Sequence, residues 1–129
     1  MTTELFDKGL QIRKDVVGED YVNASLSKAD DFNQDFQTLV TEYCWGAVWG
    51  RDGLDRKTRS LLNIAMISAL NRPHELTLHV QGAIRNGCSR EDIREVLMQV
   101  SIYCGVPAAV DGFRTARAAL DEMDAEATA

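Results

Sequence analysis

Residues 73–87 read Pro-His-Glu-Leu-Thr-Leu-His-Val-Gln-Gly-Ala-Ile-Arg-Asn-Gly, and this stretch predicts a single amphipathic helix. Proline is favoured at the first helical position, where its missing N–H loses no hydrogen bond. Gly87 supplies the left-handed residue at which many helices end. One face is apolar at helical spacing and is expected to be buried; it carries Leu76, Val80, Ala83 and Ile84.

Two titratable side chains lie on the buried side of this predicted helix. His79 falls on the apolar face, and Glu75 precedes it by four residues, so the imidazole and the carboxylate are neighbours. Apolar surroundings tune the pKa of such groups for proton transfer. His79 and Glu75 are therefore catalytic candidates. The alternative is an ordinary core or interface histidine with a glutamate as its hydrogen-bond partner.

The rest of the chain predicts an all-α fold. Apolar residues recur at helical spacing nearly throughout, and strand-like alternation is absent. We expect a single-domain bundle of about six helices over residues 1–129, with N-terminal helices in 1–30, a core in 31–122 and a frayed tail in 123–129. The expected helices are 3–17, 20–27 (a short helix or turn), 31–49, 56–70, 73–86 and those that follow Ser89 and Gly105.

The second half of the predicted helix 56–70 is apolar nearly all round. Residues 61–70 read Leu-Leu-Asn-Ile-Ala-Met-Ile-Ser-Ala-Leu. A helix of this kind is buried on several sides. Its expected place is a domain centre or a subunit interface.

Composition argues against two classes of partner. The net charge is −6, and acidic residues concentrate at the two ends of the chain, whereas nucleic-acid binding needs clustered lysine and arginine. No apolar run approaches the length of a membrane span. The N-terminus has no basic start followed by an apolar run, so no signal peptide is expected. We therefore expect a cytoplasmic protein that binds neither nucleic acid nor membrane.

The cysteines and histidines form no familiar metal or redox pattern. The three cysteines are widely spaced, and none belongs to a Cys-x-x-Cys pair. We expect buried thiols at Cys44 and Cys104, which lie on apolar faces, and a more exposed thiol at Cys88. The two histidines do not have the His-Glu-x-x-His spacing of zinc enzymes, so no metal site is expected.

Several short motifs stand out along the chain: Asp31-Phe32-Asn33-Gln34-Asp35-Phe36-Gln37, Trp45-Gly46-Ala47-Val48-Trp49, Thr58-Arg59-Ser60-Leu61, Glu75-Leu76-x-Leu78-His79, Asn86-Gly87 and Tyr103-Cys104-Gly105-Val106-Pro107-Ala108. In this order and spacing they resemble the carboxymuconolactone decarboxylase family, within the alkylhydroperoxidase D-like superfamily. The resemblance extends over nearly the whole chain. It implies the helical fold of that superfamily.

The resemblance also implies an activity. It is the decarboxylation of 4-carboxymuconolactone to 3-oxoadipate enol-lactone in protocatechuate degradation, by the β-ketoadipate pathway. The electrons left by CO2 spread through the ring double bond into the lactone carbonyl, so no cofactor is expected. His79 is then the candidate general acid or hydrogen-bond donor to the developing oxyanion. Glu75 is the candidate that sets the tautomer of His79 or shuttles its proton.

The implied substrate is a small dianionic lactone, and four residues are candidates for binding it. Arg59 and Arg51 are expected to bind its carboxylates because guanidinium groups form bidentate pairs, the alternative being solvated surface charge. Trp45 and Trp49 are expected to line the pocket and exclude water, the alternative being plain packing or interface burial.

Gln81 departs from the family, many of whose members have a basic residue at this position. The resemblance further implies a homohexamer, a trimer of dimers.

Three other functions stay open. The first is a decarboxylase or isomerase that acts on another lactone or β-keto acid. The second is a thiol peroxidase of the same fold, although Arg72 and Glu75 occupy the positions where such enzymes carry their cysteine pair. The third is a non-catalytic oligomeric helical protein whose His79 helix only packs subunits together.

Overall fold

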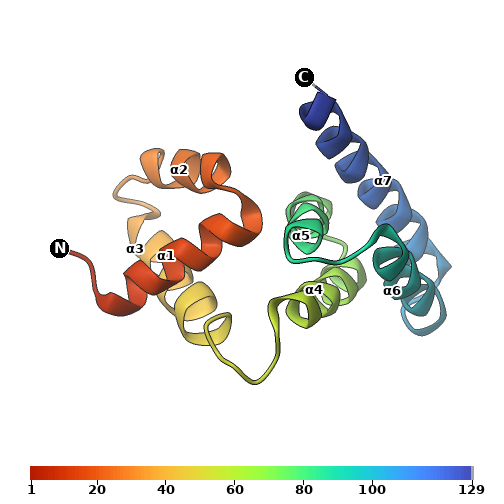
Figure 1. Ribbon diagram of the computed structural model, residues 1–129, viewed down its shortest axis with the longest axis horizontal. Coiled ribbons are helices and arrows are strands. Elements are labelled where there is room, and N and C mark those ends of the chain that lie inside the picture. The colour runs from red at the N-terminus through yellow and green to blue at the C-terminus, as the bar shows by residue number, and fades with distance from the viewer. Residues whose placement is uncertain (129) are drawn as a thin grey trace. The chain divides into compact units, whose positions relative to one another are not determined.

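The computed structural model describes residues 1–128, and every regular element in that range is a helix (Figure 1). The predicted all-α class is therefore confirmed, with seven α-helices and one π-helical segment in the described range instead of about six helices. The elements are α1 (Glu4–Val17), α2 (Glu19–Ser27), α3 (Gln34–Leu39), η1 (Val40–Val48), α4 (Arg56–Leu70), α5 (Pro73–Arg85), α6 (Arg90–Tyr103) and α7 (Val106–Thr128). None of them combines the length and the apolar character that crossing a membrane requires.

The chain divides into two compact units, which are described separately. Unit 1 covers Met1–Asp55 and contains α1, α2, α3 and η1, and unit 2 begins at Arg56 and contains α4 to α7. The expected single domain over residues 1–129 stays a prediction.

Two glycines allow α1 and η1 of unit 1 to cross in close contact. A Cβ atom on Gly9 would overlap the carbonyl oxygen of Thr41 and would lie 2.8 Å from the backbone nitrogen of Gly46. A Cβ atom on Gly46 would in turn lie 2.6 Å from the carbonyl oxygen of Leu5. Backbone therefore meets backbone at this crossing, and any side chain larger than hydrogen would separate the helices.

A buried arginine ties α1 to the helix that follows the α2–α3 loop. Arg13 is 6% exposed. Its Nη1 donates to Gln37 Oε1 at 3.0 Å and to Thr41 Oγ1 at 3.2 Å. Burial is the largest influence on the pKa of Arg13 and lowers it, because it disfavours the charged form. The sequence analysis did not find this contact, since arginine is usually a surface residue.

The helix predicted over 31–49 differs from the observed one in two respects. Asp30 Oδ1 accepts the backbone N–H of Phe32 at 3.0 Å and that of Asn33 at 3.3 Å, so the chain first makes a turn and α3 begins at Gln34. From Val40 the backbone continues as a π-helix, η1, to Val48. A periodicity of 3.6 residues cannot reveal this change, because π-helical segments are rare and short.

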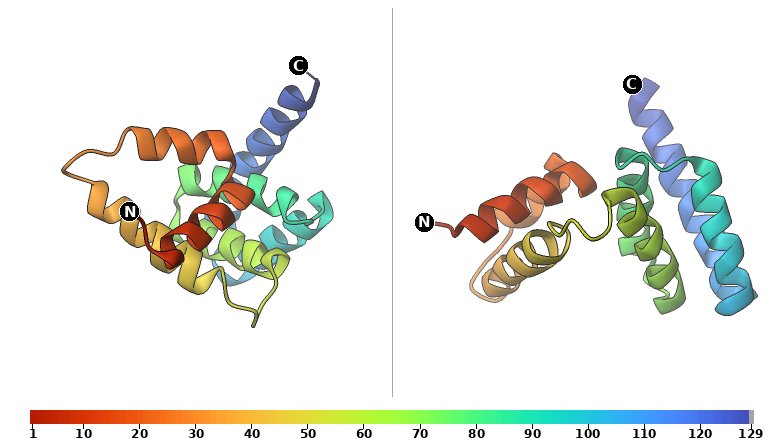
Figure 2. Two further views of the ribbon diagram at one scale, coloured as in Figure 1. Left: turned by 60° about the vertical axis from the view of Figure 1, so that its left-hand side comes forward. Right: turned by 60° about the horizontal axis from the view of Figure 1, so that its bottom comes forward.

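Unit 2 is built around an antiparallel hairpin of α4 and α5, as expected. Asn71 has a φ of 57° and makes the tight link between the two helices, and Gly87, with a φ of 93°, follows α5 as predicted. Helices α6 and α7 pack against each other, as the right-hand view of Figure 2 shows, and both contact the hairpin. The core of this unit comprises Ile64, Leu76, Val80, Ala83, Cys88, Ile93, Leu97, Ala116 and Ala119.

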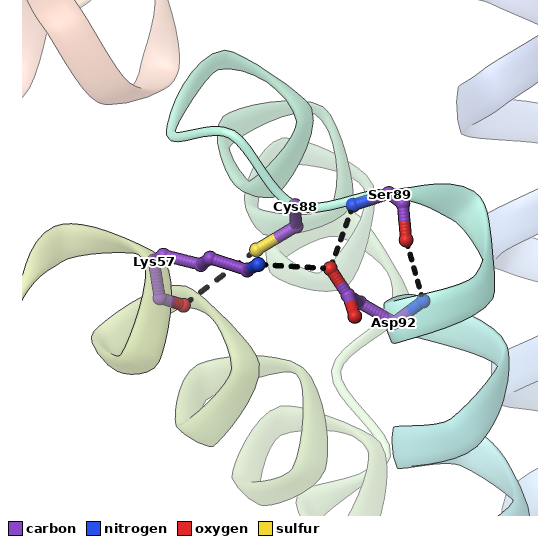
Figure 3. A network of polar contacts seen from close by, with 4 residues as sticks. All are labelled: Lys57, Cys88, Ser89 and Asp92. Carbon is purple, nitrogen blue, oxygen red and sulfur yellow. Dashed lines mark hydrogen bonds and ion pairs between the residues drawn. The ribbon is translucent and has the colours of Figure 1, made fainter.

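The cysteine predictions are wrong at all three positions. Cys44 and Cys104 are exposed, because no other part of the described chain covers the faces on which they lie. Cys88 is buried, since the turn after α5 folds it against the first turn of α4, where its Sγ lies 3.6 Å from the carbonyl oxygen of Lys57 (Figure 3).

Polar contacts hold this turn in place. The Ser89 hydroxyl accepts the backbone N–H of Asp92 at 3.0 Å, and the Asp92 carboxylate accepts the backbone N–H of Ser89 at 2.9 Å, which is the predicted capping box of α6 (Figure 3). The Asp92 carboxylate also pairs with Lys57 Nζ at 3.4 Å. The Asp92 carboxylate thus joins the start of α4 to the start of α6.

Helix α7 continues to Thr128, so residues 123–128 are helical, and the expected fraying of this tail stays a prediction. Arg90 at the start of α6 explains part of this order, because its Nη2 lies 2.7 and 2.8 Å from the two carboxylate oxygens of Asp124. Alanine and glutamate in this segment also favour helix. Residue 129 lies outside the described residues.

Helix α4 is buried on one side only within the chain. Ser60, Ile64 and Ser68 are buried. Leu62, Met66 and Leu70 are 46%, 53% and 64% exposed. The sequence analysis expected this apolar helix at a domain centre or at a subunit interface. One face of α4 does lie in the core of unit 2, and the described chain does not cover the other face.

Candidate functional site

The α4–α5 hairpin brings His79 against Asn63. Asn63 Nδ2 lies 3.4 Å from His79 Nδ1, and both side chains are half-buried. Nearer the open end of the hairpin, Asn86 Nδ2 donates to the Ser60 hydroxyl at 2.9 Å. These two contacts set the register of the hairpin and place His79 midway along it. The sequence analysis assigned no role to Asn63, although its place on the partner helix was the available signal.

The surroundings of His79 keep its imidazole neutral. Burial lowers the pKa of His79 from 6.5 to about 4, and the nearby Glu75 carboxylate opposes this shift only partly. At neutral pH the ring therefore carries one proton and no charge. A neutral imidazole is well suited to donate a hydrogen bond to a developing oxyanion, which gains electron density as the reaction proceeds.

The low pKa of His79 predicts a loss of stability in mild acid. Between pH 6.5 and about 4 the unfolded chain binds a proton that the folded chain does not, so the free energy of unfolding falls as the pH falls. The full effect below that window is about 3 kcal/mol. Urea unfolding at a series of pH values measures this effect. Below pH 6.5 the free energy of unfolding of His79→Gln should fall less steeply with falling pH than that of the wild type. His74→Gln, at an exposed position, serves as the control, and equal slopes for both variants and the wild type would contradict the prediction.

Glu75 is exposed and lies one turn before His79 on α5. Its negative charge acts electrostatically on the histidine and raises the pKa of the ring. This agrees with the expected proximity of the two side chains. Its predicted part in catalysis stays a prediction.

Arg59 lies on α4, one helical turn before Asn63, and is half-buried. Residues four apart share a face of a helix. Arg59 is therefore on the side of α4 that meets α5. This position fits the predicted role of binding a substrate carboxylate, and that role stays a prediction.

The remaining candidates lie in unit 1. Trp45 and Trp49 on η1 are 5% and 6% exposed. Their rings stack with centroids 5.0 Å apart and an angle of 25° between the planes. Arg51 follows η1 and is exposed. The pair thus packs within unit 1, and the predicted roles of the three residues in binding substrate stay predictions.

Gln81 is a core residue of unit 2. It is 9% exposed, and its Nε2 donates to the carbonyl oxygen of Ala119 on α7 at 3.1 Å. A residue two positions after His79 points away from the histidine on a helix. A basic side chain is therefore not needed at this position for α5 to pack, and Gln81 serves to hold α5 against α7.

Within residues 1–128 no group of three or more histidine, cysteine, aspartate or glutamate side chains is arranged to hold a metal ion. None of the three cysteines in this range forms a disulfide. Two groups in the described part of unit 2 have a pKa shifted from the ordinary value. Hydrogen bonding to Ser89 lowers the pKa of the Asp92 carboxyl, which caps α6, whereas burial lowers that of His79.

Comparison with known proteins places this hairpin in a defined family. The sequence model of the carboxymuconolactone decarboxylase family matches residues 34–118. The chain belongs to the carboxymuconolactone decarboxylase family. The matched range contains α4 and α5 completely, and with them Asn63, Glu75 and His79. The resemblance stated from the motifs is thereby confirmed.

Relatives within the carboxymuconolactone decarboxylase family cover most of the chain. A nitrosuccinic acid decarboxylase of Metarhizium robertsii is 42% identical over 119 residues, which are 92% of this chain and 83% of that protein. A 4-carboxymuconolactone decarboxylase of Acinetobacter baylyi is 44% identical over 103 residues, which are 80% of this chain and 77% of that protein. Both relatives are named as decarboxylases, but of different acids.

Proposed function

We propose that this protein is a carboxy-lyase that converts 4-carboxymuconolactone into 3-oxoadipate enol-lactone without a cofactor. The observation that carries the proposal is the neutral His79 in the middle of the α4–α5 hairpin of a member of this decarboxylase family. The 44% identity to a 4-carboxymuconolactone decarboxylase supports the choice of substrate.

The reaction needs an electron acceptor, and the substrate contains one. The bond between the ring carbon and its carboxylate breaks, and CO2 leaves. The electron pair moves through the ring double bond to the lactone carbonyl oxygen, which gives a dienolate. A proton added at the carbon next to that carbonyl completes the enol-lactone. The net change consumes one proton and releases one CO2.

Each proposed residue has a task in this reaction. The N–H of neutral His79 stabilises the dienolate oxygen, and the charge that develops there makes the hydrogen bond stronger in the transition state than in the bound substrate. Arg59, on the same helix as Asn63, binds a carboxylate of the dianion. Glu75, exposed one turn before His79 on α5, supplies or returns the proton.

A second substrate has its own support. The nitrosuccinic acid decarboxylase relative covers 92% of this chain. In nitrosuccinate the nitro group accepts the electron pair that CO2 leaves, so a hydrogen-bond donor at the acceptor oxygen serves both reactions. Both acids thus lose CO2 toward an acceptor oxygen, and the shape of the site determines which of them the protein prefers as its substrate.

A direct comparison of the two acids tests the proposal. The purified protein is given freshly prepared 4-carboxymuconolactone or nitrosuccinate in parallel, and CO2 release is followed together with the ultraviolet absorbance, in the presence and absence of a chelator. We expect chelator-insensitive turnover with kcat/KM at least about tenfold higher for the lactone. Higher kcat/KM for nitrosuccinate would establish the second candidate, and turnover of neither acid by folded protein would refute both.

We further propose that the protein self-associates, as a homohexamer formed by three dimers. Apolar side chains on α4 and α6 support this, since Leu70 and Ile102 are 64% and 79% exposed in the single chain. Sedimentation velocity at micromolar concentration should give the mass of six chains. A monomer would refute this assembly without bearing on the activity.

A cytoplasmic location also stays a prediction, for which cell fractionation is the test.

A further inference from the structure

We propose that Asn63 is a positioning residue that fixes the tautomer of His79 and keeps the ring proton on Nε2. The observation is the contact between the two side chains, in which the amide nitrogen Nδ2 of Asn63 faces the ring nitrogen Nδ1 of His79 at 3.4 Å. The distance is at the long end of the hydrogen-bond range, as is common in sites that tighten around a bound substrate.

The chemistry of the two facing atoms determines the tautomer. An amide nitrogen carries two donors and no acceptor, so Nδ1 must offer its lone pair to it. In a neutral imidazole one ring nitrogen accepts and the other carries the proton. An N–H group of Asn63 at Nδ1 thus places the proton on Nε2. The reversed amide, with its oxygen toward Nδ1, would place the proton on Nδ1 and leave Nε2 as a base.

The hairpin holds Asn63 in place for this role. Asn63 and His79 lie on α4 and α5, which are joined by the tight Asn71 link and by the contact from Asn86 to Ser60. Helix α5 is also fixed to α7 through Gln81. A side chain on such a rigid frame needs little ordering to keep one orientation.

This assignment moves the tautomer role from Glu75 to Asn63. Glu75 is exposed and acts on the pKa of His79 through its negative charge. A charge at a distance changes how strongly the ring binds its second proton. A direct hydrogen bond at one nitrogen decides which nitrogen keeps the proton when the ring is neutral.

The inference deepens the proposed decarboxylation and rests on it for its consequence. With the proton on Nε2, His79 is a hydrogen-bond donor to the dienolate oxygen; with the proton on Nδ1, Nε2 would present a lone pair and repel that oxygen. Asn63 would then act on the reaction only through His79, without touching the substrate.

Nuclear magnetic resonance of the ligand-free protein tests the assignment. The chain has two histidines, so two-bond proton–nitrogen correlation spectra of protein labelled with ¹⁵N-histidine are simple, and His74→Gln assigns the signals. We expect the Nε2–H pattern for His79 at neutral pH in the wild type. Asn63→Asp replaces the donor by a carboxylate oxygen of the same shape, and the dominant pattern should switch to Nδ1–H.

A matched control uses Asn86, the asparagine that directly follows α5. Asn86→Asp changes the same group in a contact between the end of α5 and α4, where the Ser60 hydroxyl is able to donate to the new carboxylate. It should leave the Nε2–H pattern of His79 unchanged. An Nδ1–H pattern in the wild type, no switch in Asn63→Asp, or an equal switch in Asn86→Asp would each overturn the proposal.

Kinetics then separate this inference from the proposed function. With whichever acid the protein turns over, Asn63→Asp should lower kcat on the order of 100-fold while KM changes little, because the wrong tautomer affects the transition state most. Undiminished kcat together with a switched tautomer would overturn the catalytic consequence. If neither acid is turned over, the spectra still decide the role of Asn63, and only the proposed function fails.

Discussion

Replacing His79 by alanine is expected to lower kcat for 4-carboxymuconolactone by about 10²–10⁴-fold, the usual cost of losing a proton donor or an oxyanion contact. The reason is that the dienolate oxygen would lose the N–H of the imidazole, which is neutral because burial lowers the pKa of His79 to about 4. Initial rates of absorbance change over a range of substrate concentrations measure kcat and KM separately. KM should change much less than kcat, because the contact forms mainly in the transition state.

A second substitution at the same position distinguishes two roles for the imidazole. Glutamine keeps an N–H donor in the side chain but cannot transfer a proton. If His79 only donates a hydrogen bond, His79→Gln should retain more activity than His79→Ala; if it transfers the proton, the two variants should be equally impaired. His74→Gln is the control for substitution of a histidine on the same helix, and circular dichroism verifies the fold. Full activity in His79→Ala would remove His79 from the mechanism.

Replacing Gly9 by alanine is expected to destabilise unit 1 by about 3 kcal/mol, at the upper end of what overpacking costs. Alanine normally stabilises the interior of a helix by up to about 1 kcal/mol relative to glycine. At Gly9 the added Cβ would overlap the Thr41 carbonyl oxygen and lie 2.8 Å from Gly46 N. Both atoms belong to the backbone of η1 and cannot rotate away, so the helices must move apart.

Urea unfolding followed by circular dichroism measures this loss. Gly53→Ala is the matched control, because nothing lies within 4 Å of the Cβ that it adds and its φ is not in the left-handed region. The control should stay within about 0.5 kcal/mol of the wild type. Equal stability of the two variants would mean that the α1–η1 crossing adapts to a methyl group.

The sequence predicted features that depend on local chemistry. The bounds of α5 follow from Pro73 and Gly87, and the capping box of α6 from Ser89 and Asp92, because each signal acts within one turn of a helix. The prediction that His79 lies in apolar surroundings was of the same kind, since it needed only the spacing along one helix. The low pKa of His79 agrees with it.

Features that depend on which helix covers which face were not predictable in this way. Periodicity placed Cys44 and Cys104 on apolar faces but could not show that the described chain leaves both exposed. It also could not show that Gln81 would be buried against α7 or that Arg13 would reach the interior of unit 1. The contact of Asn63 with His79 needed the register of the hairpin, which the Asn71 link determines.

The stacked tryptophans and the two histidines provide a separate spectroscopic signal for the unfolding of each unit. The chain has two tryptophans and two histidines. Both indole rings lie in unit 1, where they stack. Both imidazoles lie in unit 2. Tryptophan fluorescence, excited at a wavelength that tyrosine does not absorb, therefore reports on the melting of unit 1, and the histidine ring protons report on unit 2. Coincident transitions from the two signals would show that the units unfold as one cooperative system, and separated transitions would give each unit its own stability without any label or mutation.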